Sequence, residues 1–129
     1  MKIRSITLVI LAALGVTFAF SAYADGIVKR VRFAKGKHSA TLTGSVVRGD
    51  RDTYILGARG GQTINIRISS TEKNAVFQVE GPDGEHLAGA GEGDEATLLS
   101  GTLPESGDYK IIVGGTRGNA HYRLTVSIQ

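Results

Sequence analysis

The fold prediction for this chain rests first on its C-terminal residues 106–129, SGDYKIIVGGTRGNAHYRLTVSIQ. Its apolar side chains recur at every second position in both halves: Tyr109, Ile111 and Val113 in the first, and Tyr122, Leu124, Val126 and Ile128 in the second. A period of two places one set of side chains on a buried face of a β-strand and the other set in solvent. The stretch therefore predicts the two strands of a β-hairpin.

The segment that joins these two strands, Gly114–Ala120, is longer than a tight turn and rich in residues that tolerate positive φ. It carries one cation, Arg117. One interpretation is a recognition loop on a rigid scaffold, and the other is an ordinary flexible connection. The loop by itself favours the ordinary connection.

Alternation also marks strands in the rest of the chain, with turns rich in glycine between them. These predicted strands cover residues 27–33, 40–46, 53–58, 64–68, 75–79 and 96–103. The glycine-rich acidic piece at 89–95 is the least regular, and no window carries a sustained helical pattern of apolar residues. We predict an all-β fold, an antiparallel β-sandwich or flattened barrel of about eight strands. The pattern leaves the strand order open.

The N-terminus predicts export. A basic start at residues 1–4 precedes an apolar run at residues 6–20 and an Ala-x-Ala cleavage site at residues 22–24, which together indicate a secretory signal peptide cut after Ala24. The run is short for a membrane span. The mature chain, residues 25–129, then has the length of a single domain. It has no cysteine, so its stability must come from core packing.

The net charge does not indicate a nucleic-acid-binding protein. Because Lys2 and Arg4 leave with the signal peptide, 13 of the 15 basic residues remain against 12 acidic ones. Their distribution is uneven: nine cations against two anions in residues 27–67, and nine anions against one cation in residues 72–108. Either the two halves face each other and solubilise the sheets, which we favour, or a two-signed surface steers a charged partner.

The chain shows no catalytic machinery. It has no cysteine and no serine in a G-x-S-x-G elbow, and its three histidines, His38, His86 and His121, lack metal-ligand spacing. No two carboxylates stand out as a glycosidase pair, and the glycine-rich piece lacks the strand-to-helix context of a phosphate site. We therefore predict a binding protein with no reaction and no cofactor of its own.

Five segments carry a family resemblance: Val31–Ala40, Asp50–Tyr54, Gly61-Gln62, Leu103–Tyr109 and Thr116-Arg117. Together they resemble the periplasmic inhibitors of g-type (goose-type) lysozyme. The likeness covers most of the mature chain and is weakest from Gly81 to Leu98. Some of the pattern, such as Asp52-x-Tyr54, also recurs in bacterial pre-peptidase C-terminal domains, which are β-sandwiches appended to secreted proteases.

The resemblance implies a periplasmic all-β protein that inserts loops into the active-site cleft of g-type lysozyme and protects the peptidoglycan of its own cell. Arg117 matches the family's loop arginine after threonine, and His121 falls at its second basic position. An arginine on a rigid loop can form a charge-assisted hydrogen bond with a catalytic carboxylate. The expected partner-binding residues form two groups: Thr116, Arg117, Asn119 and His121 in one, and Gly49, Asp50 and Arg51 in the other.

The chain also departs from the family pattern. Gly49 replaces a tyrosine, which removes an aromatic anchor, and the segment Gly114–Ala120 is shorter and lacks a lysine-rich portion. His121 is only partly charged at neutral pH, which weakens its expected contact. The alternative is a pre-peptidase-like module that binds carbohydrate or calcium, and Asp50 and Asp52 could join the acidic piece at 89–95 in a calcium site. Turn formation at Asp50 and a fold role for Asp52 are the favoured interpretations.

Overall fold

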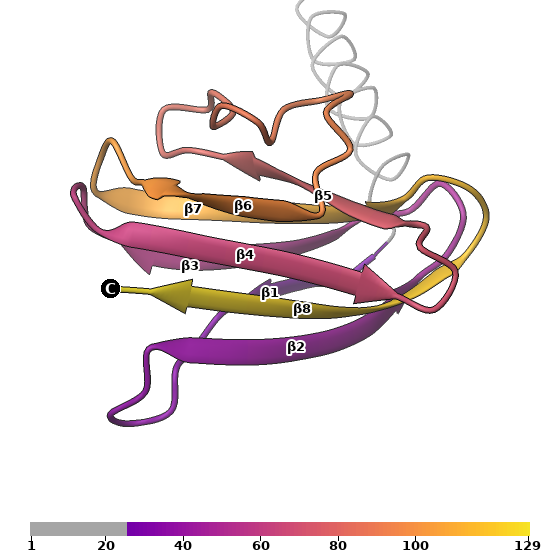
Figure 1. Ribbon diagram of the computed structural model, residues 1–129, viewed down its shortest axis with the longest axis horizontal. Helices are drawn as coiled ribbons and strands as arrows, with labels where there is room; N and C mark the ends of the chain where they lie inside the picture. Colours follow the sequence, from indigo (N-terminus) through magenta and orange to yellow (C-terminus); the bar gives the residue numbers. More distant parts are fainter. Residues whose placement is uncertain (1–25) are drawn as a thin grey trace, which may run out of the picture.

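Eight β-strands build the protein in the computed structural model, which describes residues 26–129 (Figure 1). They are β1 (Val28–Arg30), β2 (Ser39–Val46), β3 (Asp52–Ala58), β4 (Thr63–Ser70), β5 (Ala75–Glu80), β6 (Leu98–Thr102), β7 (Gly107–Gly115) and β8 (Ala120–Ile128). This range holds no helix long and apolar enough to span a membrane. The all-β prediction is confirmed. The predicted signal peptide and its cleavage site lie outside the described residues.

The strands alternate between two sheets along the chain. One four-stranded sheet has the order β1-β3-β7-β5, and we call it the odd-strand sheet. The other, the even-strand sheet, has the order β2-β8-β4-β6. Each connection between consecutive strands of the described chain therefore crosses from one layer of the sandwich to the other (Figure 1).

The predicted C-terminal hairpin is wrong, although the side chains predicted to be buried within it are buried. β7 pairs with β3 and β5, whereas β8 pairs with β2 and β4. Packed sheets lie about 10 Å apart, and the four residues between β7 and β8 are enough to bridge them because an extended chain covers up to about 3.5 Å per residue. Alternation has the same appearance in two paired strands and in two strands that face each other across a core.

The first strand also differs from its prediction. β1 is shorter than the expected residues 27–33, its side chains are exposed, and it pairs parallel to β3, whereas the other ladders of the described chain are antiparallel. The Arg30 guanidinium fastens it to β7 through two hydrogen bonds to Asp108, of 2.8 and 3.2 Å. The hydrogen bond from Arg30 lowers the pKa of the Asp108 carboxyl.

The core forms between the inward faces of the two sheets. The predicted alternation in β4 is confirmed: Ile64, Ile66 and Ile68 are buried, and the residues between them are exposed. β8 continues the same layer, with Ile66 opposite Val126 in the antiparallel register. Because both sheets supply inward-facing apolar rows, the sandwich is held by burial of apolar area in the absence of disulfides.

A chain of hydroxyl groups lies inside this core. The Tyr54 and Tyr122 hydroxyls lie 2.6 Å apart, and the Tyr122 hydroxyl donates to Asp52 Oδ2 at 2.6 Å. The other carboxylate oxygen of Asp52 accepts the main-chain N–H of Ile27 at 3.0 Å. Burial raises the pKa of both tyrosines, and the hydrogen bond to Asp52 raises that of Tyr122 further. Asp52 therefore serves the fold, as predicted, and links Ile27, the residue before β1, to Tyr122 of β8.

The segment 81–97 covers the outer edge of β5. The Val79 N–H donates to the Ala90 carbonyl at 2.9 Å, and the Leu87 N–H donates to the Val79 carbonyl at 2.9 Å. Ala90 is completely buried, and Ala96 bridges to Phe77. The glycine-rich piece expected to be the least regular thus packs against the sandwich, because small side chains let its backbone approach the strand closely.

Candidate functional site

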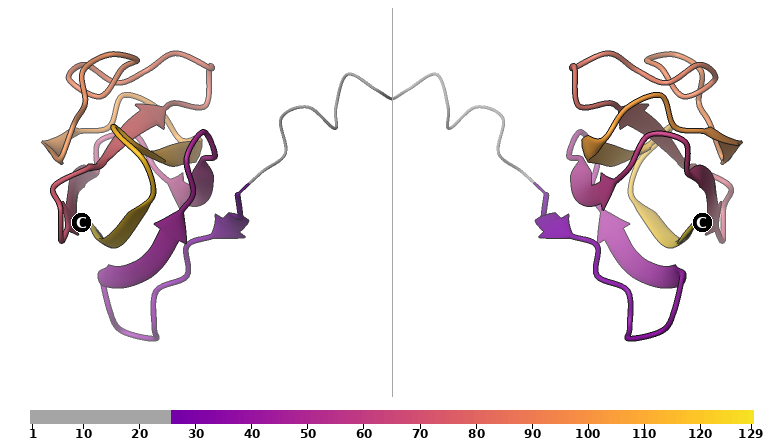
Figure 2. Two further views of the ribbon diagram at one scale, coloured as in Figure 1. Left: turned by 90° about the vertical axis from the view of Figure 1, so that its right-hand side faces the viewer. Right: turned by 90° about the vertical axis from the view of Figure 1, so that its left-hand side faces the viewer.

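Three connections meet at one end of the sandwich, which we call the arch end: residues 47–51, 71–74 and 116–119. The strand register brings them together. Val46 at the end of β2 lies opposite Ala120 at the start of β8, and Ala75 at the start of β5 lies opposite Gly115 at the end of β7. The left view of Figure 2 looks at this end. Both groups of predicted partner-binding residues therefore lie at or beside the arch end.

Asn74 holds the 116–119 connection in place. Its side-chain amide donates hydrogen bonds to the main-chain oxygens of Arg117, at 3.1 Å, and Asn119, at 2.9 Å. Its own carbonyl accepts the N–H of Thr116 at 2.9 Å. Because Asn74 is buried, with 2% of its surface exposed, these bonds are shielded from competing water. One residue thus holds the connection at three of its four residues.

The side chain of Arg117 is exposed but oriented. Its Nη2 donates to the main-chain oxygen of Glu72 at 2.8 Å. Gly118 follows with φ of +65°, a left-handed conformation that lets the connection reverse sharply after the arginine. The guanidinium has five N–H donors, so this one bond leaves most of them facing solvent. The arrangement presents the Arg117 guanidinium on a short connection whose main chain is held by hydrogen bonds.

The 47–51 connection is hydrogen-bonded to the 116–119 connection. Asn119 Oδ1 accepts the main-chain N–H of Arg48 at 2.7 Å. Gly49 supplies the turn with φ of +86°, and the Asp50 N–H donates to the Val47 carbonyl at 3.0 Å. The two connections that carry the predicted groups of residues, which are far apart in the sequence, are therefore joined by a direct hydrogen bond.

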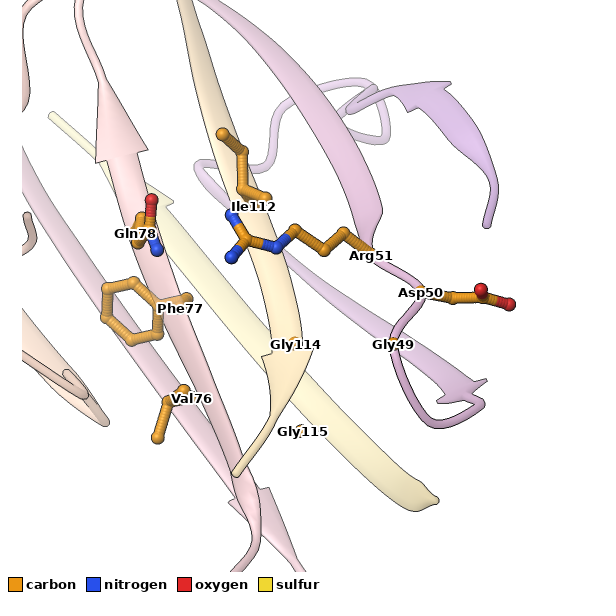
Figure 3. A pocket seen from close by; sticks show the side chains of 9 residues that line it. All are labelled: Gly49, Asp50, Arg51, Val76, Phe77, Gln78, Ile112, Gly114 and Gly115. Carbon is orange, nitrogen blue, oxygen red and sulfur yellow. The ribbon is translucent and has the colours of Figure 1, made fainter. Parts of the chain in front are cut away.

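Arg51 borders a shallow cavity of about 180 Å³ on the odd-strand sheet, beside the arch end. Its side chain extends across β7 toward Ile112, past Gly114, while Asp50 points away from the cavity (Figure 3). Val76 and Gln78 of β5 form the opposite wall. The cavity has one cationic wall and glycine on its floor, which suits a short acidic side chain of a partner.

His121 lies next to the arch, on the outer face of the even-strand sheet. Its Nδ1 is hydrogen-bonded to the Ser45 hydroxyl across the β2–β8 ladder. The ring is exposed, and this bond to Ser45 orients it. The two predicted basic positions, Arg117 and His121, are therefore close in the sequence but lie on different surfaces, one at the end and one on the face of the sandwich.

Sequence reasoning missed Asn74 and Arg48. The signal for Asn74 is slight: it is a polar residue directly before the inward-facing Ala75, and asparagine in a turn ordinarily reads as an exposed turn former. The calcium interpretation gains no ligand cluster, since the described residues contain no group of three or more histidine or acidic side chains that could hold a metal. Asp52 itself bonds to Tyr122 and to the Ile27 N–H.

The comparisons with known proteins agree on one family, although no protein-family model matches the chain. The chain is 34% identical to the "Inhibitor of g-type lysozyme" of Escherichia coli K12, over 97% of this chain and 92% of that protein. The crystal structure of a periplasmic inhibitor of g-type lysozyme from Aeromonas hydrophila superimposes with a TM-score of 0.69 at 38% identity, covering 82% of this chain and all of the other.

A third match shows the fold alone. The pre-peptidase C-terminal domain of a Bacillus anthracis collagenase has a TM-score of 0.62 at 18% identity, over 81% of this chain and 98% of that domain. The sandwich fold and the first two matches place the chain in a class of all-β proteins whose members are named as inhibitors of an enzyme. The chain belongs to the family of inhibitors of g-type lysozyme.

Proposed function

We propose that this protein acts in the periplasm, where it inhibits a g-type lysozyme by placing its arch end in the active-site cleft and so protects peptidoglycan. The observation that supports this mechanism is that hydrogen bonds hold both the main chain and the side chain of Arg117 in place. The main chain of the 116–119 connection is bonded to Asn74, and the Arg117 guanidinium is bonded to the Glu72 carbonyl. A cation that is oriented before binding loses less conformational freedom when it meets its partner.

In this mechanism Arg117 reaches the catalytic carboxylate of the lysozyme. A guanidinium presents paired N–H donors that match the two oxygens of a carboxylate, and the hydrogen bonds strengthen as the interface excludes water. Thr116 and Asn119 flank the arginine and line the same contact. The inhibitor then occupies the position that a glycan would take and masks the charge on which glycan hydrolysis depends.

The 47–51 connection provides the second contact. Arg51 beside its cavity takes an acidic side chain at the rim of the cleft, Asp50 points outward toward the partner's basic groups, and Gly49 leaves the cavity entrance open. His121 contributes a weaker contact from the side, because its ring is bonded to Ser45. Contacts from two connections held by hydrogen bonds, 47–51 and 116–119, make the orientation of the complex specific.

The test is inhibition of cell-wall clearing. The predicted mature protein, residues 25–129, is added to a g-type lysozyme acting on a cell-wall suspension, with a c-type lysozyme as control. We expect selective inhibition of the g-type enzyme. Inhibition of neither lysozyme in low or moderate salt would contradict the proposed function.

A matched pair of variants tests the role of Arg117. Arg117→Ala removes the proposed central contact, and truncation of such a residue costs about 2 kcal/mol or more, which raises the inhibition constant about 30-fold. Arg59→Ala removes an exposed arginine from the 59–62 connection at the opposite end of the sandwich and leaves inhibition unchanged. Thermal unfolding verifies that both variants are folded. Equal inhibition by both variants would exclude Arg117 as the main contact.

A further inference from the structure

The even-strand sheet carries no acidic residue. The chain has 12 aspartates and glutamates, and none of them lies in β2, β4, β6 or β8. The odd-strand sheet, by contrast, contains Asp52, Glu80 and Asp108. The segregation leaves one layer of a sandwich with an uncompensated positive charge, which is unlike the mixed charges that solubilise an ordinary surface.

The outer face of this sheet is a flat array of hydroxyl groups around two arginines. In the register of the ladders, Arg123 lies between Thr43 and Ser69, and Arg67 lies opposite Thr125. Arg67 and Arg123 therefore occupy adjacent strands in neighbouring rows, exposed on the same face. Within the described part of the chain, neither guanidinium forms a hydrogen bond or an ion pair.

Two shallow hollows mark the same face, and each includes one of these arginines. One, of about 310 Å³, is bordered by Arg123, Ser69 and His121. The other, of about 460 Å³, is bordered by Arg67, Asn65 and Ser127. The first hollow offers hydroxyl, imidazole and guanidinium groups, and the second offers hydroxyl, amide and guanidinium groups beside Leu98. Each hollow thus pairs a cation with neutral hydrogen-bonding partners.

These features fit a glycan better than a protein. Protein interfaces are anchored by aromatic and large apolar side chains in their centre, and among the outward residues of this sheet the exposed large apolar side chain is Leu98. Hydroxyl and amide groups in a flat array match the many hydroxyls of an extended sugar chain. Free guanidinium groups add a requirement for anions, and carboxylates are the anions that they bind in a paired geometry.

We propose that the outer face of the even-strand sheet is a second binding surface, which takes a glycan chain bearing carboxylates, with Arg67 and Arg123 as its anion contacts. The surface adjoins the arch end at His121, but Arg67 and Arg123 are not among the residues proposed to contact the lysozyme. If the proposed inhibition also holds, this surface keeps the inhibitor on the polymer that the lysozyme attacks.

The experiment is co-sedimentation of residues 25–129 with insoluble purified cell-wall glycan that carries its peptide carboxylates. Uncharged chitin and cell wall whose carboxylates have been amidated serve as the comparison polymers. We expect binding to the untreated wall, weakening with salt, and at least fivefold less binding to chitin and to amidated wall. Equal binding to all three polymers would overturn the proposal, as would no binding to the untreated wall.

Two double variants locate the surface. Arg67→Gln/Arg123→Gln reduces the bound fraction at least fivefold, whereas Arg32→Gln/Arg59→Gln removes the same charge outside the even-strand sheet and leaves it unchanged. Unchanged thermal unfolding shows that both are folded. Equal loss in the two variants would assign the binding to net charge alone.

Lysozyme inhibition is measured separately, with a small soluble substrate. There Arg67→Gln/Arg123→Gln inhibits like the wild type, and Arg117→Ala sediments like the wild type. Failure of wall binding with intact inhibition therefore overturns this proposal alone, and failure of inhibition with intact wall binding overturns the proposed function alone.

Discussion

The side-chain amide of Asn74 donates a hydrogen bond of 3.1 Å to the main-chain oxygen of Arg117, a residue 43 positions later in the chain. The same amide also donates to Asn119 at 2.9 Å. A buried residue of one connection thus determines where the exposed arginine of another connection is presented. This relationship makes Asn74 a positioning residue for the proposed contact.

Asn74→Asp separates positioning from contact. A carboxylate has no N–H donor, so both main-chain oxygens lose their partner, and leaving buried polar groups unpaired costs about 1 to 3 kcal/mol of unfolding free energy. Because Arg117 itself is retained, weaker inhibition measures the loss of its fixed position. Urea unfolding and the inhibition constant are measured together.

Asn65→Asp is the matched control for this variant, since it makes the same substitution at an exposed position of β4. We expect its unfolding free energy and its inhibition to stay near the wild-type values. An Asn74→Asp variant that is destabilised but inhibits as strongly as the wild type would show that the Arg117 contact does not need the hydrogen bonds from Asn74 to the 116–119 connection.

The sequence predicted burial far better than it predicted pairing. Alternation identified Tyr109 and Tyr122 as buried, and both are. It did not show that they belong to different sheets, since a strand facing another across a core has the same period as a strand paired beside it. Pairing depends on whether a connection turns back in the plane of a sheet or crosses between layers, and a short glycine-containing connection permits either.

The site was only partly predictable for a similar reason. Arg117 and Arg51 were singled out through the family resemblance, and their roles remain predictions. The Asn74 side chain donates to the main chain of Asn119, and the Arg48 main chain donates to the side chain of Asn119, a residue distant from both in the sequence. No local pattern encodes such a contact. It exists only because the strand register brings the three connections to one end of the sandwich.

Gly44→Ala tests the packing around the buried tyrosines. A Cβ atom on Gly44 would lie 2.5 Å from the hydroxyl oxygen and 2.7 Å from Cζ of Tyr122. The buried Tyr122 ring, whose hydroxyl is bonded to Asp52, must then shift, so we expect a loss of about 1 to 3 kcal/mol of unfolding free energy, as for other overpacked cores. Gly101→Ala in β6 is the control, because a Cβ there meets open space. Equal stability of the two variants would contradict this account.

The buried phenols predict a loss of stability at alkaline pH. The folded state raises the pKa of Tyr54 and Tyr122 above the ordinary value of 10.0, so their contribution is complete below about pH 10. At higher pH the unfolded chain releases protons that the folded chain retains. The unfolding free energy then falls by about 1.4 kcal/mol per pH unit for each phenol.

Urea unfolding between about pH 9 and pH 11.5 measures this slope, in the range where phenols titrate. Tyr122→Phe removes one of the two phenols. Above pH 10 the unfolding free energy of this variant should therefore fall less steeply with pH than that of the wild type, by the contribution of one phenol. Ionisation of both phenols near pH 10 in the folded wild type, seen by their ultraviolet absorbance, would contradict the prediction.

Asn119 allows charge and geometry to be distinguished at the arch end. Its Oδ1 accepts the Arg48 N–H at 2.7 Å, and an aspartate at this position offers an equivalent acceptor. Asn119→Asp should therefore keep the link between the two connections while it places a negative charge beside Arg48 and Arg117. Asn119→Ala breaks the link without adding a charge and should lower the unfolding free energy by about 0.5 to 1.5 kcal/mol.

The two variants should weaken lysozyme binding in different ways. If positive charge at the arch end steers association with an acidic cleft, Asn119→Asp lowers the association rate, and the difference from wild type shrinks as salt screens the charges. Asn119→Ala instead raises the dissociation rate at all salt concentrations, because the arginines are no longer held in one arrangement. Surface-immobilised lysozyme and a salt series give both rates. If the effect of Asn119→Asp on the association rate does not depend on salt, electrostatic steering is excluded. The arch end would then contribute to the complex through its shape alone.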